Sequence, residues 1–227
     1  MAINIDNYNK IKKQLDEKQV TLVAVSKTKT IQDIQALYDL GQRDFGENYV
    51  QELVDKYEAL PKDIRWHFIG HLQTNKVKYI AAFVHLIHGV DSEKLLSEIN
   101  KQGTKLNRIL DCLLQVYISK DETKFGFDEQ ELETLLNKIE ANNESFKHIS
   151  IKGLMGMATF TEDNALIFSE FSHLKKIFDK CNKFSIQHSE FRILSSGMSA
   201  DYSFAIQAGS TMVRIGSLLF GERNYKQ

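Results

Sequence analysis

Eight short apolar runs recur along the chain, and each is followed by a polar turn and a stretch with helical periodicity. The runs are rich in β-branched and aromatic residues, which is typical of buried strands. They are TLVAVS (21–26), DFGE (44–47), WHFIG (66–70), VHLIHGV (84–90), ILDCLLQVYI (109–118), IKGLMGM (151–157), FRILSS (191–196) and TMVRIGS (211–217). Strands that alternate with helices in this way form parallel sheets joined by right-handed crossovers.

The number of these units favours a closed sheet. Eight strand and helix units in 227 residues predict a single TIM-type (β/α)8 barrel, with an open doubly wound sheet as the alternative. Residues before Val20 predict an extra N-terminal helix. Pro61 is the only proline and there is no Gly/Ser-rich tract, so we expect residues 1–227 to form one domain without a linker.

Charge and cysteine usage narrow the class of protein. A net charge of −1 provides no broad field for nucleic acid or an anionic membrane, so neither is expected as a partner. The polar N-terminus lacks the apolar stretch of a secretion signal, and no segment reaches transmembrane length, so we expect a cytoplasmic protein. Cys112 and Cys181 lie far apart in apolar surroundings and are expected to be buried thiols.

Lys27 directly follows the first predicted strand. In barrels of this type, reactive groups lie at the carboxyl ends of the strands, so the Lys27 amine is expected in the barrel mouth. A surface lysine that ends a strand is the alternative. A lysine in a partly dry, cationic site becomes a nucleophile that can form a Schiff base with an aldehyde.

Arg214 lies inside the eighth strand, on the same face as Met212 and Gly216. An arginine on a barrel-interior face needs a partner or a ligand, so the choice is between a structural ion pair and an anionic ligand. The seventh strand ends in SSGMSADYSFAIQAG, which predicts a glycine turn and a helix that begins at Ser199. Loops after strands seven and eight are the usual phosphate site of such barrels, so a phosphorylated ligand is expected opposite Lys27.

Several longer segments resemble a known family over nearly the whole chain. The sequence is similar to the pyridoxal phosphate homeostasis proteins, the YggS/PROSC family, which are related to the N-terminal barrel of alanine racemase. The matching segments are LVAVSKTKT, FGENYVQE, WHFIGHLQTNK, HGVDS, GLMGMA, SSGMSADYSFAIQAGSTMVRIGSLLFGER and, less closely, QVYISKDETKFGF.

The resemblance implies a pyridoxal 5'-phosphate (PLP) cofactor held as a Schiff base on Lys27. It also implies that Arg214 faces the pyridine nitrogen and that residues of the last two loops lie close to the phosphate, namely Ser195, Gly197, Met198, Ser199, Gly216 and Ser217. Asn48 and His71 match family positions near the cofactor; the alternatives are that Asn48 caps a helix and that His71 holds a loop. The spacing of His67 and His71 would suit a metal only on a helix, and none is predicted there, so no metal site is expected.

Four positions depart from the family pattern. Tyr117, Lys120 and Phe125 replace the Asn, Gly and Ser that are common in the family, which leaves the contacts of that loop open. Thr30 stands where proline is usual, a change in local stiffness.

The resemblance leaves more than one function open. We favour a protein that buffers PLP or delivers it to apo PLP-dependent enzymes, as a monomer without catalytic residues. The alternative is a PLP-dependent amino-acid racemase, but racemases of this class take a second base from a C-terminal domain that this chain lacks. An arginine beside the pyridine nitrogen would also weaken the ring as an electron sink. A Schiff-base sugar-phosphate aldolase is a third class, and the sequence offers no clear acid/base pair for it.

Overall fold

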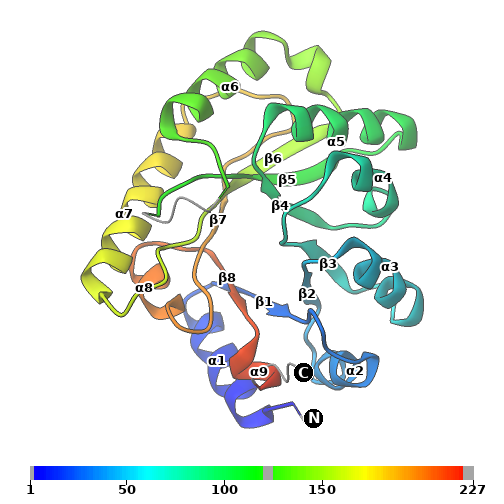
Figure 1. Ribbon diagram of the computed structural model, residues 1–227, viewed down its shortest axis with the longest axis vertical. Coiled ribbons are helices and arrows are strands. Elements are labelled where there is room, and N and C mark those ends of the chain that lie inside the picture. Colours follow the sequence, from blue (N-terminus) through cyan, green and yellow to red (C-terminus); the bar gives the residue numbers. More distant parts are fainter. Residues whose placement is uncertain (1–2, 120–124, 222–227) are drawn as a thin grey trace.

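The structure is a computed structural model that describes residues 3–119 and 125–221. Eight parallel strands form one closed barrel in the order β1 to β8, which confirms the predicted fold (Figure 1). The strands are β1 (Thr21–Val25), β2 (Asp44–Glu47), β3 (Arg65–Phe68), β4 (Leu86–Val90), β5 (Leu110–Gln115), β6 (Ile149–Met155), β7 (Ile193–Ser195) and β8 (Met212–Ile215). The barrel closes where β1 pairs with β8, from Thr21 opposite Met212 to Ala24 opposite Ile215.

Helices surround the barrel and connect its strands (Figure 1). They are α1 (Ile5–Glu17), α2 (Ile31–Asp39), α3 (Val50–Ala59), α4 (Val77–Ile80), α5 (Glu93–Leu106), α6 (Glu129–Ala141), α7 (Asn164–Cys181), α8 (Tyr202–Gln207) and α9 (Ser217–Phe220), with 3-10 turns at Thr74–Lys76 and Asn143–Phe146. Helix α1 is the predicted N-terminal helix, and the Asn4 N–H donates to the Leu219 carbonyl at 2.8 Å. None of the helices in the described ranges is long and apolar enough to cross a membrane.

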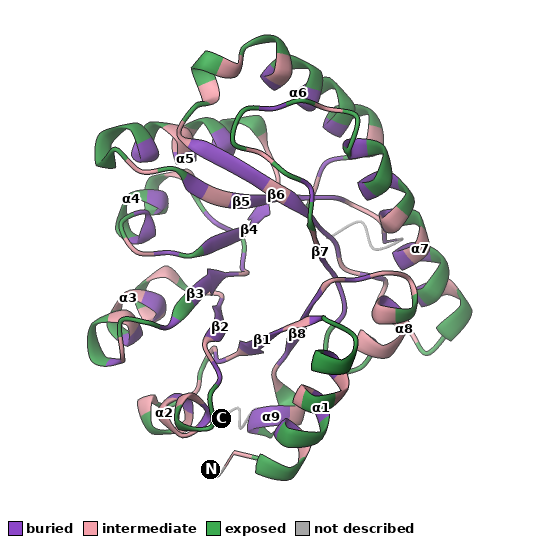
Figure 2. Ribbon diagram, turned by 180° about the vertical axis from the view of Figure 1, so that it is seen from behind, coloured by how far each residue is buried: buried purple, intermediate pink, exposed green. Residues whose placement is uncertain are grey.

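Two apolar layers follow from the alternation of side chains along each strand. The outward residues pack under the helices, with Trp66, Phe45 and Phe68 among the largest fully buried side chains (Figure 2). The inward residues form a separate cluster inside the barrel, made of Val23, Leu86, Leu113, Met155 and Met212. Buried polar side chains, among them His67, His88, Ser195 and Arg214, share the barrel interior with this cluster. Cys112 and Cys181 are free and buried, as expected.

Most predicted strands differ from the observed strands by one to three residues at an end, and two boundaries differ for a reason that the hydrogen bonds explain. The fifth strand ends at Gln115 rather than at residue 118, because the chain turns so that the Tyr117 N–H donates to the Phe127 carbonyl at 2.9 Å. The helix predicted from Ser199 begins at Tyr202. Asp201 lies before that helix, where its carboxylate accepts the Met198 N–H at 2.5 Å and holds a turn instead. Lys120, one of the positions that departs from the family pattern, lies outside the described residues.

Candidate functional site

A cavity of about 420 Å³ lies at the carboxyl ends of the strands. Seven of the ten predicted site residues line it: Lys27, Asn48, Met198, Ser199, Arg214, Gly216 and Ser217. Loops after the first, second, seventh and eighth strands therefore converge, as the position of reactive groups in this fold predicts. The described residues on the cavity wall include no histidine, tyrosine, cysteine or carboxylate, since the others are Val25, Lys29, Ile69, Met157, Phe160, Ala200 and Gly221.

The turn that presents Lys27 is fixed on both sides. The Ser26 N–H donates to the Gly46 carbonyl at 2.9 Å, and the Thr28 N–H donates to the Glu52 carboxylate on α3 at 2.5 Å. Thr28 has a φ of 66°, a conformation that is costly for a β-branched residue. Strain of this kind persists only where the surroundings fix the backbone. The structure therefore fixes the backbone on both sides of Lys27, whose partly exposed side chain lines the cavity.

A buried ion pair supports the same turn from below. Lys56 donates to the Glu47 carboxylate, to the Ser26 carbonyl and to Glu52, each at 2.7 Å. The Ser26 hydroxyl donates to Glu47 at 2.5 Å. Burial raises the pKa of Glu47 to about 7, although Lys56 beside it acts in the opposite direction. Sequence reasoning missed this cluster, because both charged residues lie among apolar neighbours only after folding.

Arg214 lies on the floor of the cavity with 4% of its surface exposed. Its guanidinium donates to the Ser195 hydroxyl at 2.7 Å, to the Ser195 carbonyl at 2.9 Å and to the Gly156 carbonyl at 3.3 Å. Burial lowers the pKa of Arg214 to about 10, and Asp201 acts in the opposite direction. No carboxylate within the described residues forms an ion pair with it, so the structural ion pair considered from the sequence is absent there.

The loops after β7 and β8 are joined at Ser199, whose hydroxyl accepts the Gly216 N–H at 3.2 Å. Gly197 has a φ of 90°, and a Cβ there would lie 2.6 Å from the Cβ of Ala205. Its carbonyl accepts the Arg214 N–H at 3.0 Å. Two of the predicted residues, Ser195 and Gly197, thus lie behind the cavity wall and position Arg214 and the loop.

Asn48 and His71 have different surroundings. Asn48 lines the cavity, and within residues 3–119 and 125–221 its buried Oδ1 has no hydrogen-bond partner. The N-cap of α3 is Tyr49, so the suggestion that Asn48 caps this helix is wrong. His71 does not line the cavity. Its Nδ1 lies 2.9 Å from the Asp91 carboxylate, and its ring stacks on Phe125 at 4.6 Å, which matches the loop-holding alternative.

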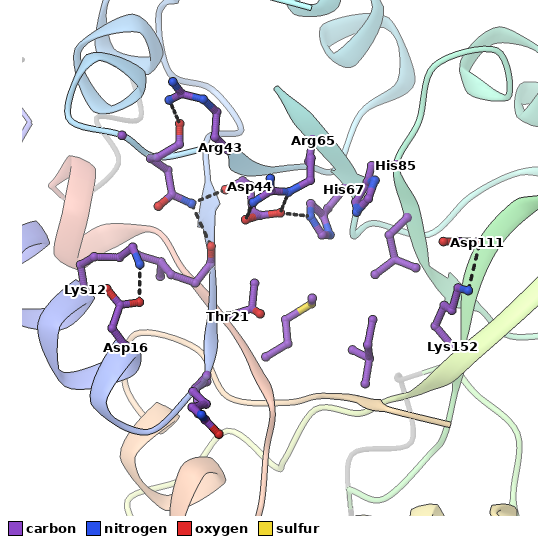
Figure 3. Close-up of a pocket in the computed structure, with 18 residues that line it drawn as sticks. Lys12, Asp16, Thr21, Arg43, Asp44, Arg65, His67, His85, Asp111 and Lys152 are labelled. Carbon is purple, nitrogen blue, oxygen red and sulfur yellow. Dashed lines mark hydrogen bonds and ion pairs between the residues drawn. The ribbon is translucent and has the colours of Figure 1, made fainter. Parts of the chain in front are cut away.

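A second cavity of about 530 Å³ lies at the opposite end of the barrel (Figure 3). Asp44, His67 and His85 bring potential ligand atoms within 4.8 Å of one another there, a group that does not include His71. Arg65 donates through Nε and Nη2 to the two oxygen atoms of the Asp44 carboxylate, so both are already engaged. Arg65 and His67 keep the pKa of Asp44 well below its usual range despite burial, which opposes them.

Comparisons with known proteins agree with this architecture. Residues 4–224 match the model of the alanine racemase N-terminal domain. The chain is 37% identical to the pyridoxal phosphate homeostasis protein of Pasteurella multocida, covering 93% of this chain and 90% of that protein, and 40% identical to that of Aquifex aeolicus, covering 90% and 87%.

Solved structures give the same result. PipY of Synechococcus elongatus PCC7942, solved with PLP bound, is 31% identical with a TM-score of 0.84, covering 95% of this chain and 99% of PipY. Alanine racemase from Bartonella henselae shares the fold alone, at 18% identity and a TM-score of 0.70, with 59% of that chain covered. The chain therefore belongs to the alanine racemase N-terminal domain family, among the pyridoxal phosphate homeostasis proteins.

Proposed function

We propose that this protein binds PLP in the cavity at the carboxyl ends of the strands, linked as a Schiff base to Lys27, and that it buffers PLP or delivers it to apo-enzymes. The observation that supports this most directly is the convergence of Lys27, Arg214 and the two loops after β7 and β8 on one cavity. PipY, solved with PLP bound, has the same fold at 31% identity.

The residues present fit the chemistry of PLP, which has an aldehyde, a phosphate and a pyridine ring. An amine for the aldehyde comes from Lys27, and backbone amides for a phosphate come from the loops joined by Ser199 and Gly216. The buried Oδ1 of Asn48 finds no hydrogen-bond partner among the described residues, which supports a ligand at this wall. When bound, PLP supplies an aldehyde that reacts reversibly with amines and a ring that accepts electrons.

The surroundings of the cavity oppose fast amino-acid chemistry. A guanidinium at the pyridine nitrogen would disfavour protonation of that nitrogen, which weakens electron withdrawal by the ring. Racemisation also requires two bases on opposite faces of the substrate, and the described residues of the cavity wall offer only the amines of Lys27 and Lys29. The Lys29 amine is already engaged, since it donates to the Phe220 carbonyl at 3.1 Å. The same lack of an acid/base pair opposes an aldolase.

The linkage can be tested by borohydride reduction followed by peptide mass mapping. We expect the phosphopyridoxyl group on Lys27, because this amine alone combines a fixed strand-end turn with the two loops. Lys27→Ala should lose the visible absorbance and still unfold cooperatively, whereas Lys29→Ala, on the same cavity wall, should retain it. An adduct chiefly on Lys29 or Lys76 would reject the assignment.

The delivery role needs a separate experiment. The PLP-loaded protein is mixed with an apo PLP-dependent enzyme, with and without a scavenger of free PLP, and the recovered activity is measured. Recovery that persists with the scavenger indicates direct transfer. In parallel, racemase and decarboxylase rates across common amino acids should not exceed those of free PLP, and a fast turnover that depends on Lys27 would favour the racemase alternative.

A further inference from the structure

A continuous line of hydrogen bonds connects Arg214 with the opposite end of the barrel. The Ser195 hydroxyl, 2.7 Å from the Arg214 guanidinium, lies 3.1 Å from Nδ1 of His88. Nε2 of His88 lies 2.9 Å from Nδ1 of His67, and Nε2 of His67 lies 3.0 Å from Asp44. All five residues are buried, with at most 8% of their surface exposed. We call this set the barrel chain.

The barrel chain crosses the interior instead of following the sheet. Arg214 and Ser195 belong to the neighbouring strands β8 and β7, and His88, His67 and Asp44 belong to the consecutive strands β4, β3 and β2. Strands β7 and β4 are not neighbours, so the bond between Ser195 and His88 passes across the barrel. Figure 3 shows the far end, where His67 and Arg65 both point at Asp44.

The groups at the two ends of the barrel chain set the direction in which its hydrogen bonds are donated. Arg214 can only donate, so the Ser195 oxygen accepts, and the Ser195 hydrogen is free to bond to Nδ1 of His88. His88 then carries its proton on Nε2 and donates to His67, which donates from Nε2 to the Asp44 carboxylate, a group that only accepts. In the reverse direction, the Ser195 hydrogen would have no acceptor among the hydrogen bonds of the described residues. Burial, the largest cause, and nearby charges keep the pKa of His88 well below its usual range, in agreement with a neutral ring.

We infer that Asp44 and His67 are positioning residues for Arg214, acting through His88 and Ser195 from the far end of the barrel. The guanidinium is buried without a carboxylate partner in the described residues, and aligned hydrogen bonds that end on an anion stabilise such a charge. The inference rests on the proposed function, because it takes Arg214 to face the bound cofactor. It adds that the electrostatics of the cofactor site depend on residues at the opposite barrel end.

A measurement on the ligand-free protein tests the direction without any cofactor. In protein labelled with ¹⁵N-histidine, long-range proton–nitrogen spectra report which ring nitrogen carries hydrogen. His67 and His88 are both expected as neutral rings protonated on Nε2. A proton on Nδ1 of either ring, or a doubly protonated His67 at neutral pH, would overturn the one-way chain.

The positioning role is tested by His67→Leu, with His85→Leu as the matched control. His85 lines the same cavity and its ring lies edge-on to His67, but it is not part of the barrel chain. In the ligand-free protein, the Arg214 Nη resonances should be resolved in the wild type and in His85→Leu, and averaged in His67→Leu. PLP affinity should fall about tenfold only in His67→Leu, in keeping with the loss of a hydrogen bond to a charged group, and the bands of bound PLP should redistribute.

The possible outcomes separate this inference from the proposed function. If the wild-type protein binds no PLP, the proposed function is rejected. The Arg214 resonances of the ligand-free protein would still test the positioning role of the barrel chain. Unchanged Arg214 resonances in a folded His67→Leu protein would reject the positioning role. If His67→Leu does not fold, Asp44→Asn takes its place with Asp111→Asn as control, because Asp111 pairs with Lys152 in the same cavity. Equal Arg214 resonances in these two variants would also reject it.

Discussion

The Lys56 ammonium lies 2.7 Å from the Glu47 carboxylate, and the two side chains are 5% and 0% exposed. The pair lies directly under Ser26, so the turn that presents Lys27 rests on two buried charges. Glu47 Oε2 has no hydrogen-bond partner in the described part of the chain, which leaves this carboxylate incompletely satisfied there. Removing one partner of such a pair costs more than the pair itself contributes, because the other charge stays buried.

The buried Glu47 predicts a pH-dependent stability that Glu47→Gln removes. The pKa of Glu47 is about 7 in the folded protein and near 4.5 in the unfolded chain, so between these values the folded state holds more protons. Stability from this group is therefore full below pH 4.5 and is lost as the pH rises through 7, by at most about 1.4 kcal/mol per pH unit. The free energy of unfolding of Glu47→Gln, minus that of the wild type, should increase from pH 5 to 7.

The comparison with Glu47→Gln is needed because buried histidines change the stability of the protein with pH in the opposite direction. Burial lowers the pKa of His85 to about 4 and keeps that of His88 well below its usual range, so their contribution is present above the unfolded value of 6.5 and is lost as the pH falls. Denaturant titrations at each pH give the free energy of unfolding of the wild type and of Glu47→Gln. The histidine contributions are common to both proteins and cancel in the difference. A difference that is flat or decreases across the window would contradict the raised pKa of Glu47.

Thr28→Gly is expected to stabilise the protein. The left-handed backbone of Thr28, at a φ of 66°, costs an L-residue roughly 1–2 kcal/mol that glycine avoids, while glycine's greater freedom in the unfolded chain costs roughly 0.5–1 kcal/mol. The net gain is therefore at most about 1.5 kcal/mol. The control is Thr30→Gly, which removes the capping box of α2 and should lose a few tenths of a kcal/mol or more. Equal signs for the two variants in urea unfolding would exclude strain at Thr28.

Comparing Gly197→Ala with Gly41→Ala separates the cost of backbone strain from the cost of steric overlap in the loop after β7. The added Cβ would lie 2.6 Å from the Cβ of Ala205 and 2.9 Å from the Cα of Tyr202, whereas Gly41, at a similar φ of 98°, has nothing within 4 Å. Both alanine variants incur the strain, roughly 1–2 kcal/mol, and only Gly197→Ala adds an overpacking cost of roughly 1–3 kcal/mol. Thermal unfolding should rank them in that order, and PLP affinity should fall only for Gly197→Ala.

The fold and much of the site followed from local patterns. Strand interiors alternate between the inner cluster and the outer helices, so Arg214 could be placed on the inner face with Met212 from sequence alone. Lys27 could be placed at the mouth because strand ends in this fold converge there. The turn at Asp201 could not be predicted from the sequence. An aspartate that holds a turn and an aspartate in the first turn of a helix have the same sequence signature.

Contacts between side chains across the barrel could not be predicted from the sequence for a different reason. His88 lies in an apolar strand and Ser195 ends another, and 107 residues separate them. Their hydrogen bond depends on the register and tilt of strands that are not neighbours. The Glu47 and Lys56 pair likewise needs the packing of α3 on β2, which no periodicity specifies. Histidine inside a strand of otherwise apolar residues was the one available signal.

The side chain at position 214 places a positive charge on the floor of the cavity. Arg214 donates to oxygen atoms of Ser195 and Gly156, and as a cation on the floor of the cavity it should disfavour a proton on the pyridine nitrogen of bound PLP. Arg214→Glu reverses that charge and should favour the proton, so the visible and near-ultraviolet bands redistribute at constant pH. Arg214→Gln, which is neutral, should give an intermediate spectrum. Absorbance spectra at equal PLP occupancy, measured across pH, provide the comparison. If the three proteins bind PLP with the same spectrum, Arg214 does not act on the ring, and the electrostatic argument against fast amino-acid chemistry fails with it.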